Sequence, residues 1–161
     1  MVRVLLFDWG NTIMVDHGLP GPMYLWEKID WVPFAEESLK ILNRTYPCYL
    51  ATNAGLSDHR MVLKALQRVG ADTCFSGIFT STDLGVEKPH PDFFQAICDQ
   101  LGLLPSDCLM IGDHYIKDIT GARQFGMKTV WLNSMKLTGD FSLADRVIHS
   151  MAELPDTIQS L

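Results

Sequence analysis

Short apolar runs of strand length alternate along this chain with longer segments of helical period. Such runs are typical of strands buried on both faces of a parallel sheet, and they cover Val2–Phe7, Pro47–Ala51, Gly77–Thr80, Cys108–Ile111 and Lys128–Leu132. The helical segments lie between them, at Phe34–Tyr46, Ser57–Gly70, Pro91–Gly102 and Ile116–Gly126. This alternation predicts βαβ units, and therefore an α/β fold with a doubly wound parallel sheet.

Residues that commonly start or end helices support these boundaries. Ser57 is placed to cap the second helix, Pro91 to open the third in its first turn, and Gly126 to end the fourth. A short strand at Arg146–His149 and a helix from Ala152 onward complete the expected architecture.

The stretch Leu19–Phe34 breaks the alternation. It opens with two prolines and a glycine and continues with aromatic residues that predict a helix ending before Pro33. We expect an insert of about residues 14–33 to form a flap or minimal cap within a single domain over residues 1–161. The insert is more apolar than a one-sided surface helix requires. It could pack on the body, contact another subunit, or form a hydrophobic lip facing the substrate.

The net charge of −6 argues against general binding to nucleic acids or to anionic membranes, because such a surface repels phosphate groups. The first apolar run ends at Asp8, which makes it too short for a signal peptide or a membrane span. No CxxC pair occurs, so neither a zinc knuckle nor a thioredoxin-type site is indicated. No glycine-rich nucleotide loop occurs either, and we expect no organic cofactor. A cytoplasmic location is expected by default.

Polar side chains follow the ends of several predicted strands. Asp8 ends the first strand, Thr52 the second and Asp113 the fourth, and Lys88 lies in the turn after the third. Ligands of doubly wound sheets bind outside the carboxyl ends of the strands. Two carboxylates at this edge would suit Mg²⁺, and a neighbouring lysine would suit a phosphoryl group. The sequence therefore predicts phosphoryl-transfer chemistry.

These residues lie in four segments that resemble the motifs of the haloacid dehalogenase-like hydrolases, in the family's order. The segments are LLFDWGNT, YLATN, EKPHPDFF and MIGDHYIKD, and the resemblance spans about residues 4–133. It implies a Rossmann-like three-layer fold with sheet order 5-4-1-2-3 and a very small insert in place of a cap. It also implies a Mg²⁺-dependent phosphohydrolase that forms an aspartyl-phosphate.

The resemblance assigns roles to individual residues. Asp8 would be the nucleophile, and Thr52, Asn53 and Lys88 would hold the phosphoryl group. The metal ligands would be the carboxylates of Asp8 and Asp113 and the backbone carbonyl of Gly10, together with Asp118, which acts directly or by orienting Lys88 or a metal-bound water.

The sequence departs from the family pattern at Gly10, where related phosphatases carry an aspartate that acts as general acid and base. Asp16 or His17 in the flap could replace it. Two alternatives to the phosphatase also remain open. One is a non-catalytic protein that binds phosphate and metal, and the other is a phosphonatase-like carbon–phosphorus hydrolase, for which the insert offers only Lys28.

The small insert also bears on the partners. An open site would accept a bulky phosphorylated substrate, or it would be closed by a second subunit of a homo-oligomer.

Overall fold

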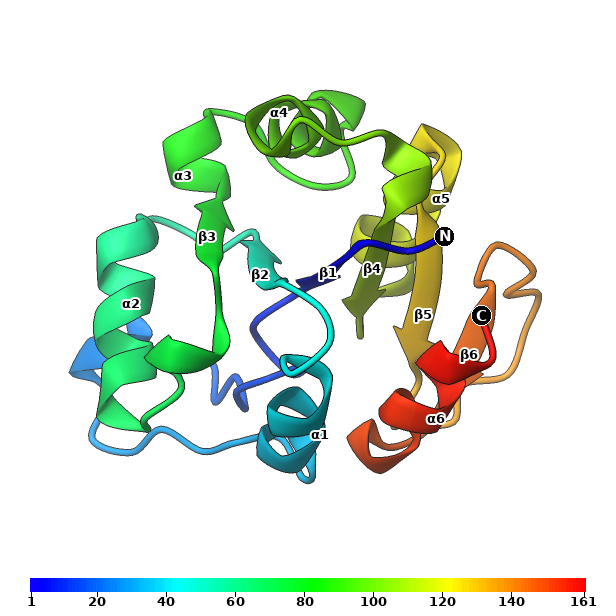
Figure 1. The fold of residues 1–161 in the computed structure, drawn as a ribbon. Coiled ribbons are helices and arrows are strands. Elements are labelled where there is room, and N and C mark those ends of the chain that lie inside the picture. Colours follow the sequence, from blue (N-terminus) through cyan, green and yellow to red (C-terminus); the bar gives the residue numbers. More distant parts are fainter.

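Six parallel strands form one sheet in the order β3-β2-β1-β4-β5-β6 (Figure 1). The computed structural model describes residues 1–161. The strands are β1 (Val4–Phe7), β2 (Cys48–Thr52), β3 (Gly77–Thr80), β4 (Cys108–Gly112), β5 (Lys128–Leu132) and β6 (Arg146–Ile148). The α/β fold and the order 5-4-1-2-3 are confirmed, and β6 extends the sheet beside β5.

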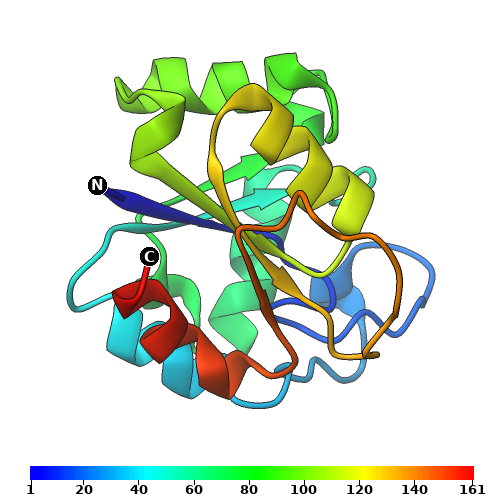
Figure 2. The same cartoon turned by 90° about the vertical axis from the view of Figure 1, so that its right-hand side faces the viewer.

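Helices cover both faces of the sheet, as Figure 2 shows from the side. One face carries α1 (Ala35–Leu42), α2 (His59–Arg68) and α6 (Leu154–Gln159), and the other carries α4 (Pro91–Leu101) and α5 (Gly121–Phe125). The short α3 (Ser81–Leu84) follows β3 directly. Single 3-10 turns lie at Met23–Leu25, Asp72–Cys74, Pro105–Asp107 and Met151–Glu153. None of the helices is both long and apolar enough to cross a bilayer.

Alternate residues of the central strand face opposite layers of the core. Leu5 and Phe7 pack with α1, α2 and α6, whereas Val4 and Leu6 pack with α4 and α5. All four side chains are buried, as expected for a strand covered on both faces. Asp8 follows directly at the carboxyl end of this buried strand.

The prediction of a helix in the insert is wrong, since only the 3-10 turn Met23–Leu25 forms there. The reason lies outside the segment. The guanidinium of Arg68 in α2 donates to the carbonyl oxygens of Tyr24 at 2.9 Å and Glu27 at 3.0 Å, and also to that of Trp26. Because a continuing helix needs those carbonyls for its own hydrogen bonds, the insert follows α2 as an irregular flap instead.

Two helix starts also differ from expectation. Asp58, not Ser57, caps α2, and its carboxylate accepts the amide of Met61 at 2.9 Å. A carboxylate at this position also gains from the helix dipole. The segment expected as one helix over 116–126 begins as a π-helical turn, Tyr115–Thr120, and becomes α-helical at Gly121.

We predict that Gly121→Ala lowers the free energy of unfolding by about 1–3 kcal/mol, because the added methyl overpacks a filled core. Its Cβ would lie 2.8 Å from the Cβ and 3.0 Å from the Cα of Pro89. Urea denaturation measures the change. Gly10→Ala is the matched control, because its Cβ would meet nothing closer than Asp16 at 3.5 Å. Equal stability of the two variants would contradict the prediction.

Candidate active site

Asp8, Thr52 and Asp113 meet at the carboxyl edge of the sheet, where the strand order reverses at β1. The amide of Asp8 donates to the carbonyl of Ile111 at 2.9 Å, so the parallel ladder continues one residue past β1. A pocket of about 180 Å³ lies at this edge, and no apolar residue lines it. Its lining consists of Asp8, Gly10, Asn11, Asp16, Thr52, Asn53, Lys88, Asp113, His114, Lys117 and Asp118.

Lys88 is the centre of the charge network. Its side chain is 1% exposed, and its Nζ lies 2.8 Å from Oδ1 of Asp8 and 2.6 Å from Oδ1 of Asp118. Burial alone would lower the pKa of Lys88, but the charges of Asp118 and Asp8 outweigh it and raise the pKa above its usual value. The lysine is therefore a fixed cation at the floor of the pocket.

Asn53 fixes the backbone that carries this lysine. Its amide nitrogen donates to the carbonyl of Lys88 at 2.8 Å, and its amide oxygen accepts the N–H of Lys88 at 2.9 Å. The turn after β2 is thereby tied to the loop before α4. Asn53 also lines the pocket, so the residue can both position Lys88 and contact a ligand.

Three carboxylates gather around the lysine. One oxygen from each of Asp8, Asp113 and Asp118 lies within 4.8 Å of the others. Burial first, and then the negative charge of Asp8, raises the pKa of Asp113 to about 6, although Thr12 donates to Oδ1 of Asp113 at 3.2 Å. Burial raises the pKa of Asp118 to about 7, with Lys88 opposing the shift and Asp8 adding to it.

The charge of this cluster fits a hard divalent cation. Three carboxylates face a single lysine, so the cluster carries more negative than positive charge when all three are ionised. Carboxylate oxygens, with backbone carbonyls such as that of Gly10 in the same lining, are ligands that Mg²⁺ accepts. The predicted metal residues are thus all brought together.

The π-helical turn and Gly112 set the position of Asp118. Its Oδ2 accepts the amide of His114 at 2.9 Å while its Oδ1 meets Lys88. A Cβ on Gly112 would lie 2.2 Å from Oδ2 of Asp118. Because no real contact is that short, only glycine lets this carboxylate fold back under the end of β4.

The structure separates the two flap candidates for the missing acid. Asp16 lines the pocket and borders the space that a side chain at Gly10 would fill, with its Cβ 3.5 Å and its Oδ2 3.7 Å from an ideal Cβ there. The amide of Gly18 donates to Oδ1 of Asp16 at 2.8 Å. His17 instead pairs with Asp30 at 2.9 Å and does not line the pocket.

Sequence reasoning gave no role to three residues of the site. Thr12 bonds Asp113, and Asn11 and Lys117 line the pocket. Thr12 stands four residues after Asp8 inside the first motif, and Lys117 stands one residue before Asp118. Their positions within these motifs could have predicted that both belong to the site. Asn11 has a φ of 57°, which sequence alone does not reveal, although asparagine tolerates that conformation better than most residues.

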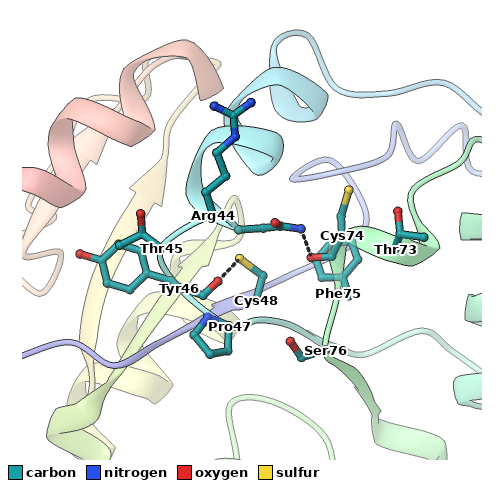
Figure 3. A pocket seen from close by; sticks show the side chains of 10 residues that line it. Arg44, Thr45, Tyr46, Pro47, Cys48, Thr73, Cys74, Phe75 and Ser76 are labelled. Carbon is teal, nitrogen blue, oxygen red and sulfur yellow. Dashed lines mark hydrogen bonds between the residues drawn. The ribbon is translucent and has the colours of Figure 1, made fainter.

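A larger cavity of about 380 Å³ lies at the other end of β2 and β3, lined by residues 43–48 and 73–76 (Figure 3). Arg44 is its one charged lining residue, and in Figure 3 its side chain extends away from the cavity. The thiol of Cys48 donates to the carbonyl of Tyr46 at 3.4 Å. No carboxylate lines this cavity, so the chemistry assigns the active site to the smaller pocket.

The chain is similar in sequence to known hydrolases. A family model described as haloacid dehalogenase-like hydrolase matches residues 31–126. N-acylneuraminate-9-phosphatase from Rattus norvegicus is 32% identical over 108 residues, which cover 65% of this chain and 43% of that protein. Glyceraldehyde 3-phosphate phosphatase from Pyrococcus furiosus is 33% identical over 95 residues, which cover 58% of this chain and 40% of that protein. The chain therefore spans less than half the length of these relatives.

Solved structures show the same fold. An uncharacterized protein from Listeria monocytogenes serotype 4b aligns with a TM-score of 0.86 at 21% identity, covering 99% of this chain and 98% of that one. A HAD phosphatase from Thermococcus onnurineus aligns with a TM-score of 0.81 at 20% identity, covering 98% of each chain.

We predict that Mg²⁺ raises the melting temperature by several degrees at pH 8 and by less at pH 5. Metal-free Asp113 has a pKa of about 6, so a proton competes with the cation at pH 5 and not at pH 8. The raised pKa also means that the metal-free protein loses stability as the pH rises from about 4 through 6. Thermal denaturation with and without Mg²⁺ measures both effects.

The control for the magnesium effect is Asp113→Asn, which should remove the stabilisation at both pH values. An equal Mg²⁺ shift at pH 5 and pH 8, or a full shift in the variant, would show that this cluster is not where the cation binds.

Proposed function

The chain belongs to the haloacid dehalogenase-like hydrolases, and from this premise we propose that it is a phosphohydrolase in which Asp8 is the nucleophile. The observation that carries the proposal is the position of Asp8 in an entirely polar pocket, beside the buried cation of Lys88 and the carboxylate of Asp113. Both curated relatives are named as phosphatases, which supports the same reaction class.

The reaction would proceed in two steps. A carboxylate oxygen of Asp8 forms a bond to phosphorus, while the bond to the leaving-group oxygen breaks and that oxygen takes a proton. Water then attacks the phosphorus of the aspartyl-phosphate and gives up a proton, which releases inorganic phosphate and restores Asp8. The Oδ1 of Asp8 is held by Lys88 at 2.8 Å, which fixes the orientation of the nucleophilic carboxylate.

Four groups of the chain would stabilise the transferring phosphoryl group. Lys88 supplies a fixed positive charge, and the Thr52 hydroxyl and the Asn53 amide are donors at the end of β2. These groups are held before substrate arrives, so little reorganisation is needed in the transition state. Lys117 adds a second cation at the pocket rim. When bound, Mg²⁺ would neutralise the charge on the phosphoryl oxygens, with Asp8, Gly10, Asp113 and Asp118 as the residues that hold it.

Asp16 would act as the general acid that is absent at position 10, where the chain has Gly10. Its Oδ1 is fixed by the amide of Gly18, and its Oδ2 borders the space beside Gly10. A proton on Oδ2 would pass to the leaving-group oxygen in the first step, and water would return one to it in the second. The open pocket would admit a bulky phosphorylated substrate.

The observations favour this reading over the two alternatives. A phosphonatase-like reaction needs a lysine that the insert brings into the site, but Lys28 is 77% exposed, pairs with Asp30 at 2.9 Å and does not line the pocket. A non-catalytic role rested on the missing acid at Gly10, and Asp16 supplies a carboxylate beside that position. Turnover measurements separate the phosphatase from both.

We expect Mg²⁺-dependent release of phosphate from acetyl phosphate and from an aryl phosphate, because good leaving groups need little acid assistance. Asp8→Asn should abolish release from both, since the amide is a poor nucleophile. Phosphate assays on the wild type and the variant measure this, with the far-UV circular dichroism spectrum of the variant as the folding control. A folded wild type that binds Mg²⁺ and releases no phosphate from either compound would favour the non-catalytic role.

We expect Asp16→Asn to lower kcat/KM for an alkyl phosphate by about 10²- to 10⁴-fold, the usual value of general acid catalysis. Hydrolysis of acetyl phosphate should change little. His17→Asn is the matched control and should alter neither, because His17 faces Asp30. Equal losses on both substrates would mean that Asp16 supports the flap and donates no proton.

A further inference from the structure

A groove leads out of the active-site pocket between the flap and the loop after β2. It has a volume of about 320 Å³ and shares Gly10, Asp16, Thr52 and Asn53 with the pocket. A neighbouring hollow of about 320 Å³ continues it and shares Gly21, Pro22, Ala54, Gly55 and Ser57 with the groove. The phosphoryl site therefore opens along one continuous path.

The polarity of the walls changes along this path. The pocket has no apolar lining residue, whereas the groove is lined by five, among them Trp9, Leu19 and Met23. Farther out, Leu56 and Met61 line the neighbouring hollow. Asp16 is the one charged residue in the groove, and the hollow has none. A second anionic group on a substrate would meet a carboxylate here and no cation.

Two basic residues of α2 contact the flap. Arg68 donates to the flap carbonyls of Tyr24 and Glu27 at 2.9 and 3.0 Å. Lys64 lies over the ring of Tyr24, 5.1 Å from its centroid. The indole of Trp26 donates to the carbonyl of Gly21 at 3.1 Å, which fixes the flap wall from within. The groove is thus formed in advance.

We propose that this groove binds the leaving group of the substrate and that the leaving group is uncharged and largely apolar, as in an aryl phosphate or an apolar alkyl phosphate. The inference rests on the proposed phosphohydrolase. A cavity of about 150 Å³ accepts a benzene-sized ligand, so the groove has room for more than one ring. Asp16 lines both regions and would therefore lie beside the oxygen that links the phosphoryl group to the leaving group.

The test compares kcat/KM for phenyl phosphate, 2-naphthyl phosphate and 3-carboxyphenyl phosphate. Their phenols have similar acidity, so differences report binding of the leaving group. We expect 2-naphthyl phosphate to exceed phenyl phosphate by about tenfold, as an additional apolar contact in a pocket gives. The carboxyphenyl compound should fall below phenyl phosphate by about fivefold, the effect of one like charge at about 4 Å in water.

A variant makes the test specific to this groove. Leu56→Lys places a cation at the hollow, and because Leu56 is 94% exposed the fold should not change. We expect the carboxyphenyl-to-phenyl ratio of kcat/KM to rise about fivefold. Leu104→Lys is the matched control, because Leu104 is also exposed but lies before the amino end of β4, and it should leave the ratio unchanged.

Acetyl phosphate separates the two proposals. If Asp8-dependent hydrolysis of acetyl phosphate is present and the three aryl phosphates react alike or not at all, the groove inference is overturned and the phosphatase stands. If no compound is turned over, both are overturned. Two results together support the inference. The wild type and Leu104→Lys both prefer 2-naphthyl phosphate, and Leu56→Lys alone raises the carboxyphenyl-to-phenyl ratio of kcat/KM.

Discussion

The ammonium group of Lys88, buried between the carboxylates of Asp8 and Asp118, is the interaction on which the rest of the site depends. A buried charge is tolerated only when it is paired, and removing one partner of such a pair costs about 3–5 kcal/mol. The pair joins the chain after β1 to the π-helical turn after β4, and Asn53 adds the turn after β2. Loops distant in sequence are therefore held in one arrangement by the same charges that serve the chemistry.

This arrangement leaves the site short of positive charge. One lysine balances only part of three carboxylates, and burial, with the charge of Asp8 adding to it, raises the pKa values of Asp113 and Asp118 to about 6 and 7. A purely structural network would be expected to balance its charges more closely. The imbalance is better explained by ligands that come and go, a cation that the carboxylates attract and a phosphoryl group that needs that cation.

Much of this site could be predicted from the sequence, because strand ends are set by local patterns. The apolar runs place Asp8, Thr52 and Asp113 at one edge, and the register of a parallel sheet brings them together. The flap could not be predicted in this way. Its conformation depends on Arg68, more than forty positions away from the carbonyls it binds. Asp16 reaches Gly10 only because the flap folds back, so no local pattern could choose between Asp16 and His17.

The same use of Arg68 bears on what the site can recognise. A guanidinium is the side-chain group best suited to bind a carboxylate or a second phosphate on a substrate. Here it is committed to the backbone carbonyls of the flap, and Lys64 to the ring of Tyr24. Both contact the flap and neither lines the groove, in which Asp16 is the one charged residue. The arrangement that stabilises the flap therefore leaves the groove without a cation that could bind an anionic leaving group.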